Sequence, residues 1–65
     1  MDAEKIRDRM TATGFDMTRM AEGIGINRTT LWRKLTGKLA FTVPEAQSMC
    51  RLLKIEDPRD YFFDR

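Results

Sequence analysis

The sequence has no histidine, one cysteine and no long apolar run, and these absences exclude several classes of protein. A single cysteine cannot form a disulfide within the chain, and a Cys/His zinc site cannot be assembled without histidine. The usual acid–base and nucleophile pairs of enzymes are missing too, so we expect no enzyme, no metal and no cofactor. Cys50 is interpreted as a small buried apolar residue.

Membrane and secretory features are equally scarce. No apolar run approaches the ~18 residues that a membrane-spanning helix needs. The sequence is charged from Asp2 onward and has no signal-peptide core, so we expect a reduced, cytoplasmic location. The 65 residues are expected to form a single domain, residues 1–65, with no small-molecule ligand.

Positive charge is concentrated in the middle of the chain. The net charge is only +2, but residues 23–44 contain no acidic residue. The basic residues of this window are Arg28, Arg33, Lys34 and Lys38. A basic face on an otherwise acidic body is typical of a protein that binds a phosphate-rich partner, whereas the simpler alternative is a solvated charged face.

Glycines and prolines divide the chain into helical pieces, and no segment alternates like a strand. Helices are expected over residues 2–13, from 16 to a turn at Gly25, over 27–36, from 42 onward, and in a short segment after Asp57. Asp16 and Asn27 are good N-cap residues, and Thr42 with Glu45 forms a capping box. The apolar face of these helices comprises Ala3, Ile6, Met10, Met17, Met20, Ala21, Ile24, Leu31, Leu35, Ala46, Met49, Cys50 and Leu53. The sequence therefore predicts an all-α domain of four to five helices.

Residues 16–37 have the local pattern of a helix-turn-helix DNA-binding motif. Ala21 is small enough to let the two helices cross closely, Gly25 permits a positive φ in the turn, and Leu31 fills the space between the helices. Gly23, inside the first of these helices, weakens it by up to ~1 kcal/mol relative to alanine. Close packing against a neighbouring segment is one explanation for this glycine.

The segment 24–37, with Met20 and Ala21 before it, resembles the lambda-repressor and Cro family of phage-type transcriptional regulators, and the five-helix layout extends the resemblance over nearly the whole chain. The resemblance implies a compact lambda-repressor-like domain. Helix 27–36 would lie in the major groove of double-stranded operator DNA, in association with the nucleoid of a bacterial cell.

One side of helix 27–36 carries hydrogen-bonding side chains at helical spacing. We expect Arg28, Thr29 and Arg33 to contact bases, since arginine can donate two hydrogen bonds to guanine and threonine can contact thymine. The alternative for the arginines is contact with phosphate or water alone. Contacts with the DNA backbone are expected from Arg19, Asn27, Thr30, Trp32, Lys34, Thr36 and Lys38.

Two positions in the motif leave alternatives open. Trp32 either lies at the edge of the groove or packs on the helix that follows. Many members of the resembled family have a glutamine where this chain has Met17, and that glutamine holds a backbone phosphate. Arg19 is the candidate to replace it.

The chain ends in an aromatic segment, Tyr61, Phe62 and Phe63. One or two of these rings can pack on the domain itself, and the remainder would form an apolar patch suited to a homodimer. The resembled family commonly dimerises through this end. Symmetric dimers place two such helices roughly 34 Å apart, one DNA turn.

These observations predict a sequence-specific, DNA-binding transcriptional regulator, most like a Cro-type phage repressor that binds as a homodimer. The main alternative is a protein-interaction module, of an antirepressor or antitoxin kind, on a helix-turn-helix fold. A protein-binding face should be apolar at its centre, whereas this one is rich in arginine and threonine. A nonspecific nucleic-acid chaperone, the second alternative, would usually contain more lysine.

Overall fold

Capping residues and positive-φ residues set the bounds of the helices. The computed structural model describes residues 1–62 and contains α1 (Ala3–Ala12), α2 (Met17–Ile24), α3 (Arg28–Leu35), α4 (Val43–Leu53) and a 3₁₀ helix, η1 (Pro58–Asp60). Each α-helix ends one or two residues before a residue whose φ is positive; these residues are Gly14, Gly25, Gly37 and Lys54. Residues 1–62 contain no strand, so the predicted all-α fold is confirmed.

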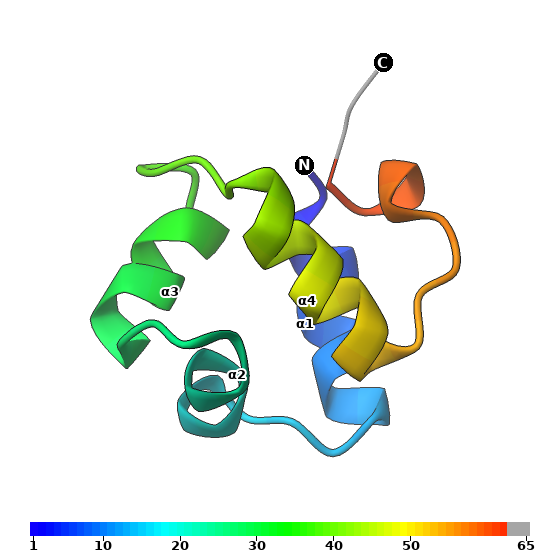
Figure 1. Cartoon of the computed structure of the whole chain (residues 1–65), viewed down its shortest axis with the longest axis horizontal. Helices are drawn as coiled ribbons and strands as arrows, with labels where there is room; N and C mark the ends of the chain where they lie inside the picture. Colours follow the sequence, from blue (N-terminus) through cyan, green and yellow to red (C-terminus); the bar gives the residue numbers. More distant parts are fainter. Residues whose placement is uncertain (63–65) are drawn as a thin grey trace.

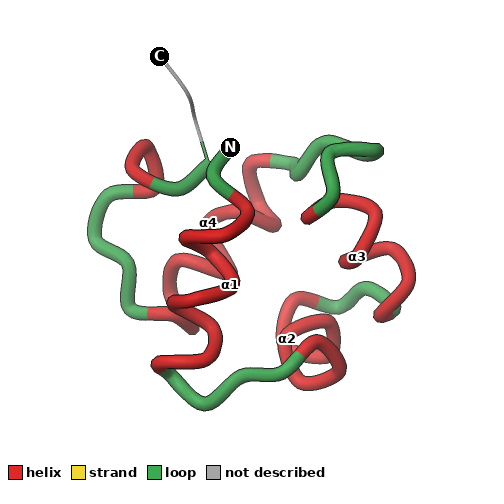
Figure 2. The backbone as a smooth tube through the Cα atoms, turned by 180° about the vertical axis from the view of Figure 1, so that it is seen from behind, coloured by secondary structure: helices red, strands yellow, loops and turns green. Residues whose placement is uncertain are grey.

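The helices pack as two neighbouring groups. α2 and α3 pack against each other and lie to one side of α1 and α4 (Figures 1 and 2). Arg9 of α1 joins α1 to the end of α4, because its guanidinium donates hydrogen bonds to the carbonyl oxygens of Leu53 and Lys54 at 2.8 and 3.0 Å. Contacts between α2 and α4 connect the two groups, so α3 is held through α2 and through the loop that leads into α4.

The core is formed by the apolar faces that helical spacing predicts. Its fully buried large side chains are Ile6, Met20, Leu31, Met49 and Leu53. Cys50 is buried, and burial is the main cause that raises the pKa of its thiol above the usual value. Met17 and Ile24, also predicted to face inward, are half-buried at the edge of this core, and Ala3 is half-buried.

Close packing accounts for Gly23 in the middle of α2. A Cβ atom at this position would lie 2.8 Å from Cδ1 of Leu52, well inside van der Waals contact. The glycine therefore lets α4 approach α2 closely. The structure supports the explanation that Gly23 is present because of this close packing.

The last element differs from the predicted helix. Asp57 caps it and Pro58 opens it, as expected, but only Pro58–Asp60 adopts a 3₁₀ conformation. Tyr61 is its C-cap, and Phe62 turns inward to be buried at 7% exposure. The ring of Phe62 meets Phe41 edge to face at 5.4 Å, which closes the core beneath the loop between α3 and α4.

Two features of the described residues bear on chemistry. None of their helices has the length and apolar character that crossing a membrane requires. Among residues 1–62, no three His, Cys, Asp or Glu side chains lie close enough together to hold a metal ion.

Candidate nucleic-acid interface

The turn between α2 and α3 fixes the geometry of the motif. Asp16 caps α2 by accepting a hydrogen bond from the backbone N–H of Arg19 at 2.8 Å, and Asn27 caps α3 in the same way with Thr30. Gly25 adopts φ 78° between the two helices, a conformation that glycine accepts without strain. The predicted helix-turn-helix is therefore present, with α3 as its second helix.

The two sides of α3 have different roles. Leu31, Lys34 and Leu35 face the core and anchor the helix. The exposed side chains are Arg28, Thr29, Trp32, Arg33 and Thr36. Because three anchoring residues hold α3 against the domain, its exposed face can meet a ligand without the helix having to move.

Arg28, Thr29 and Arg33 are the predicted base-contacting residues, and the structure brings all three to this exposed face. Within residues 1–62, their side chains make no hydrogen bond or ion pair with the protein. Their donors therefore remain available for an external partner.

The expected backbone-contacting residues differ in their exposure and in the hydrogen bonds that their side chains already make. Arg19 and Lys38 are exposed, one near the start of α2 and one just after α3. Asn27 and Thr36 are exposed too, but their side chains are already used within the domain. The amide oxygen of Asn27 caps α3, and the hydroxyl of Thr36 donates to carbonyl oxygens of Trp32 and Arg33. Thr30 is half-buried.

Lys34 departs from its expected position at the DNA backbone. It is 7% exposed, and its Nζ lies 2.8 Å from Oε1 of Glu45 and donates to the carbonyl oxygen of Ala40 at 2.9 Å. Nζ also lies 5.8 Å from the centre of the Phe41 ring. These partners satisfy the hydrogen-bonding capacity of the amine inside the protein, so the Lys34 side chain is not part of the exposed face of α3.

Glu45 completes this internal network. Its Oε1 accepts from the backbone N–H of Thr42 at 2.9 Å, and the Thr42 hydroxyl accepts from the N–H of Glu45 at 3.2 Å, so the predicted capping box is confirmed. Burial raises the pKa of Glu45, but hydrogen bonds with Lys34 and Thr42 and the charge of Lys34 outweigh it. The pKa is therefore lowered below its usual value.

Trp32 lies outside the core, and its surroundings include a residue that sequence reasoning missed. The indole is 48% exposed, which matches the groove-edge alternative for this residue. The guanidinium carbon of Arg7, from α1, lies 5.7 Å from the centre of the Trp32 ring. No local sequence signal links two residues 25 positions apart, so this contact follows only from the tertiary arrangement that brings Arg7 of α1 near Trp32 of α3.

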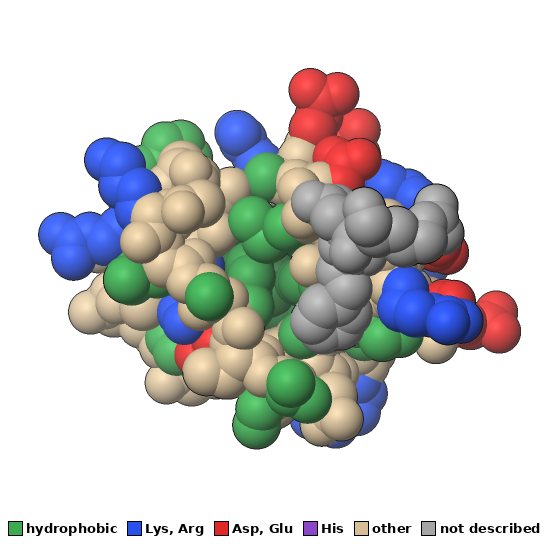
Figure 3. Space-filling model, turned by 90° about the horizontal axis from the view of Figure 1, so that it is seen from above, with side chains coloured by type: hydrophobic (Ala, Val, Ile, Leu, Met, Phe, Trp, Pro, Cys, Tyr) green, Lys and Arg blue, Asp and Glu red, His purple; other side chains and the backbone are tan. Residues whose placement is uncertain are grey.

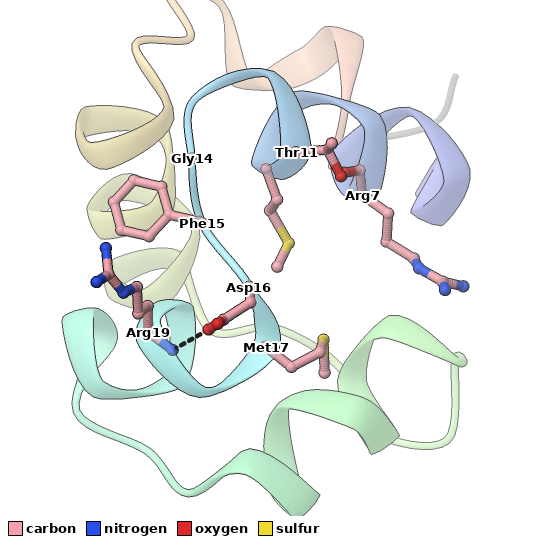
Figure 4. A pocket seen from close by; sticks show the side chains of 8 residues that line it. Arg7, Thr11, Gly14, Phe15, Asp16, Met17 and Arg19 are labelled. Atoms are coloured by element: carbon pink, nitrogen blue, oxygen red, sulfur yellow. Dashed lines mark hydrogen bonds between the residues drawn. The ribbon is translucent and has the colours of Figure 1, made fainter.

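A hollow of about 590 Å³ separates α1 from the first turn of α2, and two arginines line it. Figure 4 shows Arg7 and Arg19 pointing away from each other on opposite sides of it. They therefore do not converge on one small anion. Met17 extends from the same turn toward α3 (Figure 4).

The predicted homodimer residues are used mainly within the domain. Phe62 is buried, and the ring of Tyr61 lies 4.7 Å from Nζ of Lys5 while its carbonyl oxygen accepts from the N–H of Asp2. Phe62 therefore packs in the core and does not form part of an exposed apolar patch. Phe63 lies outside the described residues.

Acidic side chains are unevenly distributed over the molecule. In Figure 3, Lys and Arg side chains project at the edge where Figure 1 places α3 and also on the opposite side, whereas most of the visible Asp and Glu side chains lie on that opposite side. Such a distribution favours a phosphate-rich partner at the α3 edge.

Comparison with known proteins agrees with this geometry. A family model described as "Bacterial regulatory protein, Fis family" matches residues 1–36, just over half of the chain. The match spans α1, α2 and α3 and ends at the C-cap of α3. No curated protein and no solved structure matches the chain. The match supports a helix-turn-helix regulator and does not extend to the finer lambda-repressor or Cro resemblance. The chain belongs to the Fis family of bacterial regulatory proteins and is a DNA-binding transcriptional regulator of the helix-turn-helix type.

Proposed function

We propose that this DNA-binding regulator is sequence-specific and acts as a Cro-like repressor, with residues 27–36 in the major groove of operator DNA. The observation that carries the proposal is the exposed, unpaired set of Arg28, Thr29 and Arg33 on a helix anchored by Leu31 and Leu35. Donors held on a fixed helix can distinguish base pairs, whereas mobile surface lysines would bind phosphate alone. Occupying an operator would then block polymerase directly.

We further propose that two copies bind each operator. One α3 helix offers three base-contacting side chains, enough to discriminate only a few base pairs. Typical specific binding is 10³–10⁷ times tighter than nonspecific binding, and each mismatched base pair costs about 1–3 kcal/mol. Two copies on half-sites one turn apart would double the number of discriminating contacts. This argument for a homodimer on DNA does not depend on Phe62.

Selection of bound fragments from random double-stranded DNA tests both proposals. We expect an enriched site with two inverted half-sites whose centres lie 10–10.5 base pairs apart or a multiple of that. A single enriched half-site would contradict the two-copy proposal and leave sequence specificity standing. No enrichment, with binding to DNA retained, would contradict sequence-specific regulation. No binding at all would favour a protein partner for the exposed face of α3.

A further inference from the structure

A second hollow, of about 380 Å³, lies beside the exposed face of α3. It is lined by Met17 from the first turn of α2 and by Arg28, Thr29 and Trp32 from α3. The proposed interface does not explain it, because the expected contacts there are hydrogen bonds and ion pairs. Two of its four lining residues, Met17 and Trp32, are instead large apolar side chains.

The walls of this hollow are already in position in the free protein. Met17 is half-buried and packs against the core, so its thioether is held at the edge of α2. The indole of Trp32 is 48% exposed and has the guanidinium of Arg7 5.7 Å from its ring centre. This contact from α1 restrains the indole, so the apolar wall does not have to form on binding.

The hollow adjoins the side chains proposed to contact bases, since Arg28 and Thr29 belong to both sets. A phosphate gains nothing from a thioether and an indole, and sugars do not reach the floor of the major groove. The apolar group that DNA presents in that groove is the C5-methyl group of thymine. Apolar contact with this methyl is one of the established ways in which proteins distinguish T·A from C·G.

We infer that the Met17–Trp32 hollow binds the C5-methyl group of one thymine in each half-site, and that Met17 is a specificity-determining residue. The inference rests on the proposed function, because it places α3 in the major groove. Thymine is the occupant because its methyl is the apolar group on a base edge in the groove where the proposed function places Arg28 and Thr29. The Thr29 methyl group adds to the apolar wall.

The test replaces each thymine of the selected site by uracil, one at a time, and measures the affinity of the wild-type protein. Uracil keeps the base pair and removes only the methyl group. We expect one thymine per half-site whose replacement weakens binding roughly fourfold, the effect of burying one methyl group. At that position, the protein should bind DNA with 5-methylcytosine roughly fourfold more tightly than DNA with cytosine. This comparison distinguishes the contribution of the methyl group from that of the base pair.

Variants then connect the effect to the hollow. Met17→Gln should bind the thymine and uracil sites equally, while Met17→Leu, which keeps an apolar wall, should retain the preference for thymine. Val43→Ala is the matched control, because Val43 is an exposed apolar residue that does not line the hollow. It should keep the wild-type ratio.

The outcomes distinguish this inference from the proposed function. A selected site at which every thymine tolerates uracil would overturn the inference and leave sequence-specific binding intact. The inference would also be overturned if cytosine and 5-methylcytosine bound equally, or if folded Met17→Gln kept the fourfold preference. Absence of any selected site would instead overturn the proposed function.

Discussion

We expect the basic residues in and after α3 to affect DNA binding differently, because only some of them are proposed to contact base edges. Arg33 lies on the exposed face of α3, whereas Lys38 lies just after it and Lys34 points into the domain. Base contacts discriminate between sequences, and phosphate contacts add affinity on all of them. Single substitutions can therefore separate these roles.

Arg33→Ala should weaken binding to the selected site by about 1–3 kcal/mol and relax the preference at one base pair. The physical reason is the loss of a bidentate donor to a guanine edge. Fluorescence anisotropy on the selected site and on its single-base variants would measure both effects. If Arg33→Ala lowered affinity by the same factor on every sequence, Arg33 would be a phosphate contact instead.

Lys38→Ala should weaken binding to all DNA alike, because it removes one charge that neutralises a phosphate. The slope of log affinity against log salt concentration should decrease in magnitude by about 1. Measurements on the selected site and on unrelated DNA at several salt concentrations would show this. An unchanged slope would contradict a phosphate contact by Lys38.

At the scale of the elements, the buried pair of Lys34 and Glu45 joins α3 to the first turn of α4. Glu45 has a lowered pKa, so its charged form contributes stability above the unfolded-state pKa. That contribution is lost as pH falls through the folded-state pKa. The free energy of unfolding should therefore decrease in the acid range partly because of this one carboxylate.

Lys34→Met should reduce this acid dependence, since Glu45 loses the partner that lowers its pKa. The variant should also be less stable at neutral pH by roughly 3 kcal/mol, because it leaves a partly buried carboxylate unpaired. Urea unfolding at neutral pH and at about pH 3.5, below the usual carboxylate pKa, would measure both changes. Lys38→Met is the matched control, because Lys38 is an exposed lysine four residues later. Equal effects of the two substitutions would show that the ion pair does not stabilise the fold.

The sequence predicts most of the elements and fewer of the contacts between them. Caps such as Asp16 and Thr42, and turns such as Gly25, depend on residues a few positions apart, so local chemistry identifies them. The exposure of Arg28 and Arg33 follows from the same helical spacing. The Arg7–Trp32 contact depends on how separate helices pack, and residue spacing along the chain does not predict it.

The burial of Lys34 was missed for a related physical reason. Lysine is almost never buried unless it is paired, and its partner here lies eleven positions away in another helix. The 3₁₀ turn at Pro58–Asp60 likewise replaces a longer helix because Phe62 turns into the core. In both cases tertiary packing overrides what local sequence favours.

At the scale of the whole molecule, the C-terminal aromatic segment completes a very small core. A 65-residue domain buries only about 60% of its unfolded surface, so each large core side chain contributes a substantial share of its stability. Phe62 reaches back over the chain to Phe41, which lies in the loop after α3. The tail therefore stabilises the loop that connects α3, the helix of the proposed interface, to α4.

Phe62→Ala should accordingly destabilise the isolated domain by about 3–5 kcal/mol, a large part of the 5–15 kcal/mol typical of a domain. Urea unfolding at several protein concentrations would measure it, and the loss should not depend on concentration, because the lost contacts lie within one chain. Leu39→Ala, at an apolar residue that is 45% exposed, is the control and should change stability little. If Phe62→Ala kept its stability but converted a dimer into a monomer in sedimentation, Phe62 would be an intermolecular contact. The expected result would instead assign Phe62 to the stability of a single chain. The proposed pairing of two copies on DNA would then involve other residues.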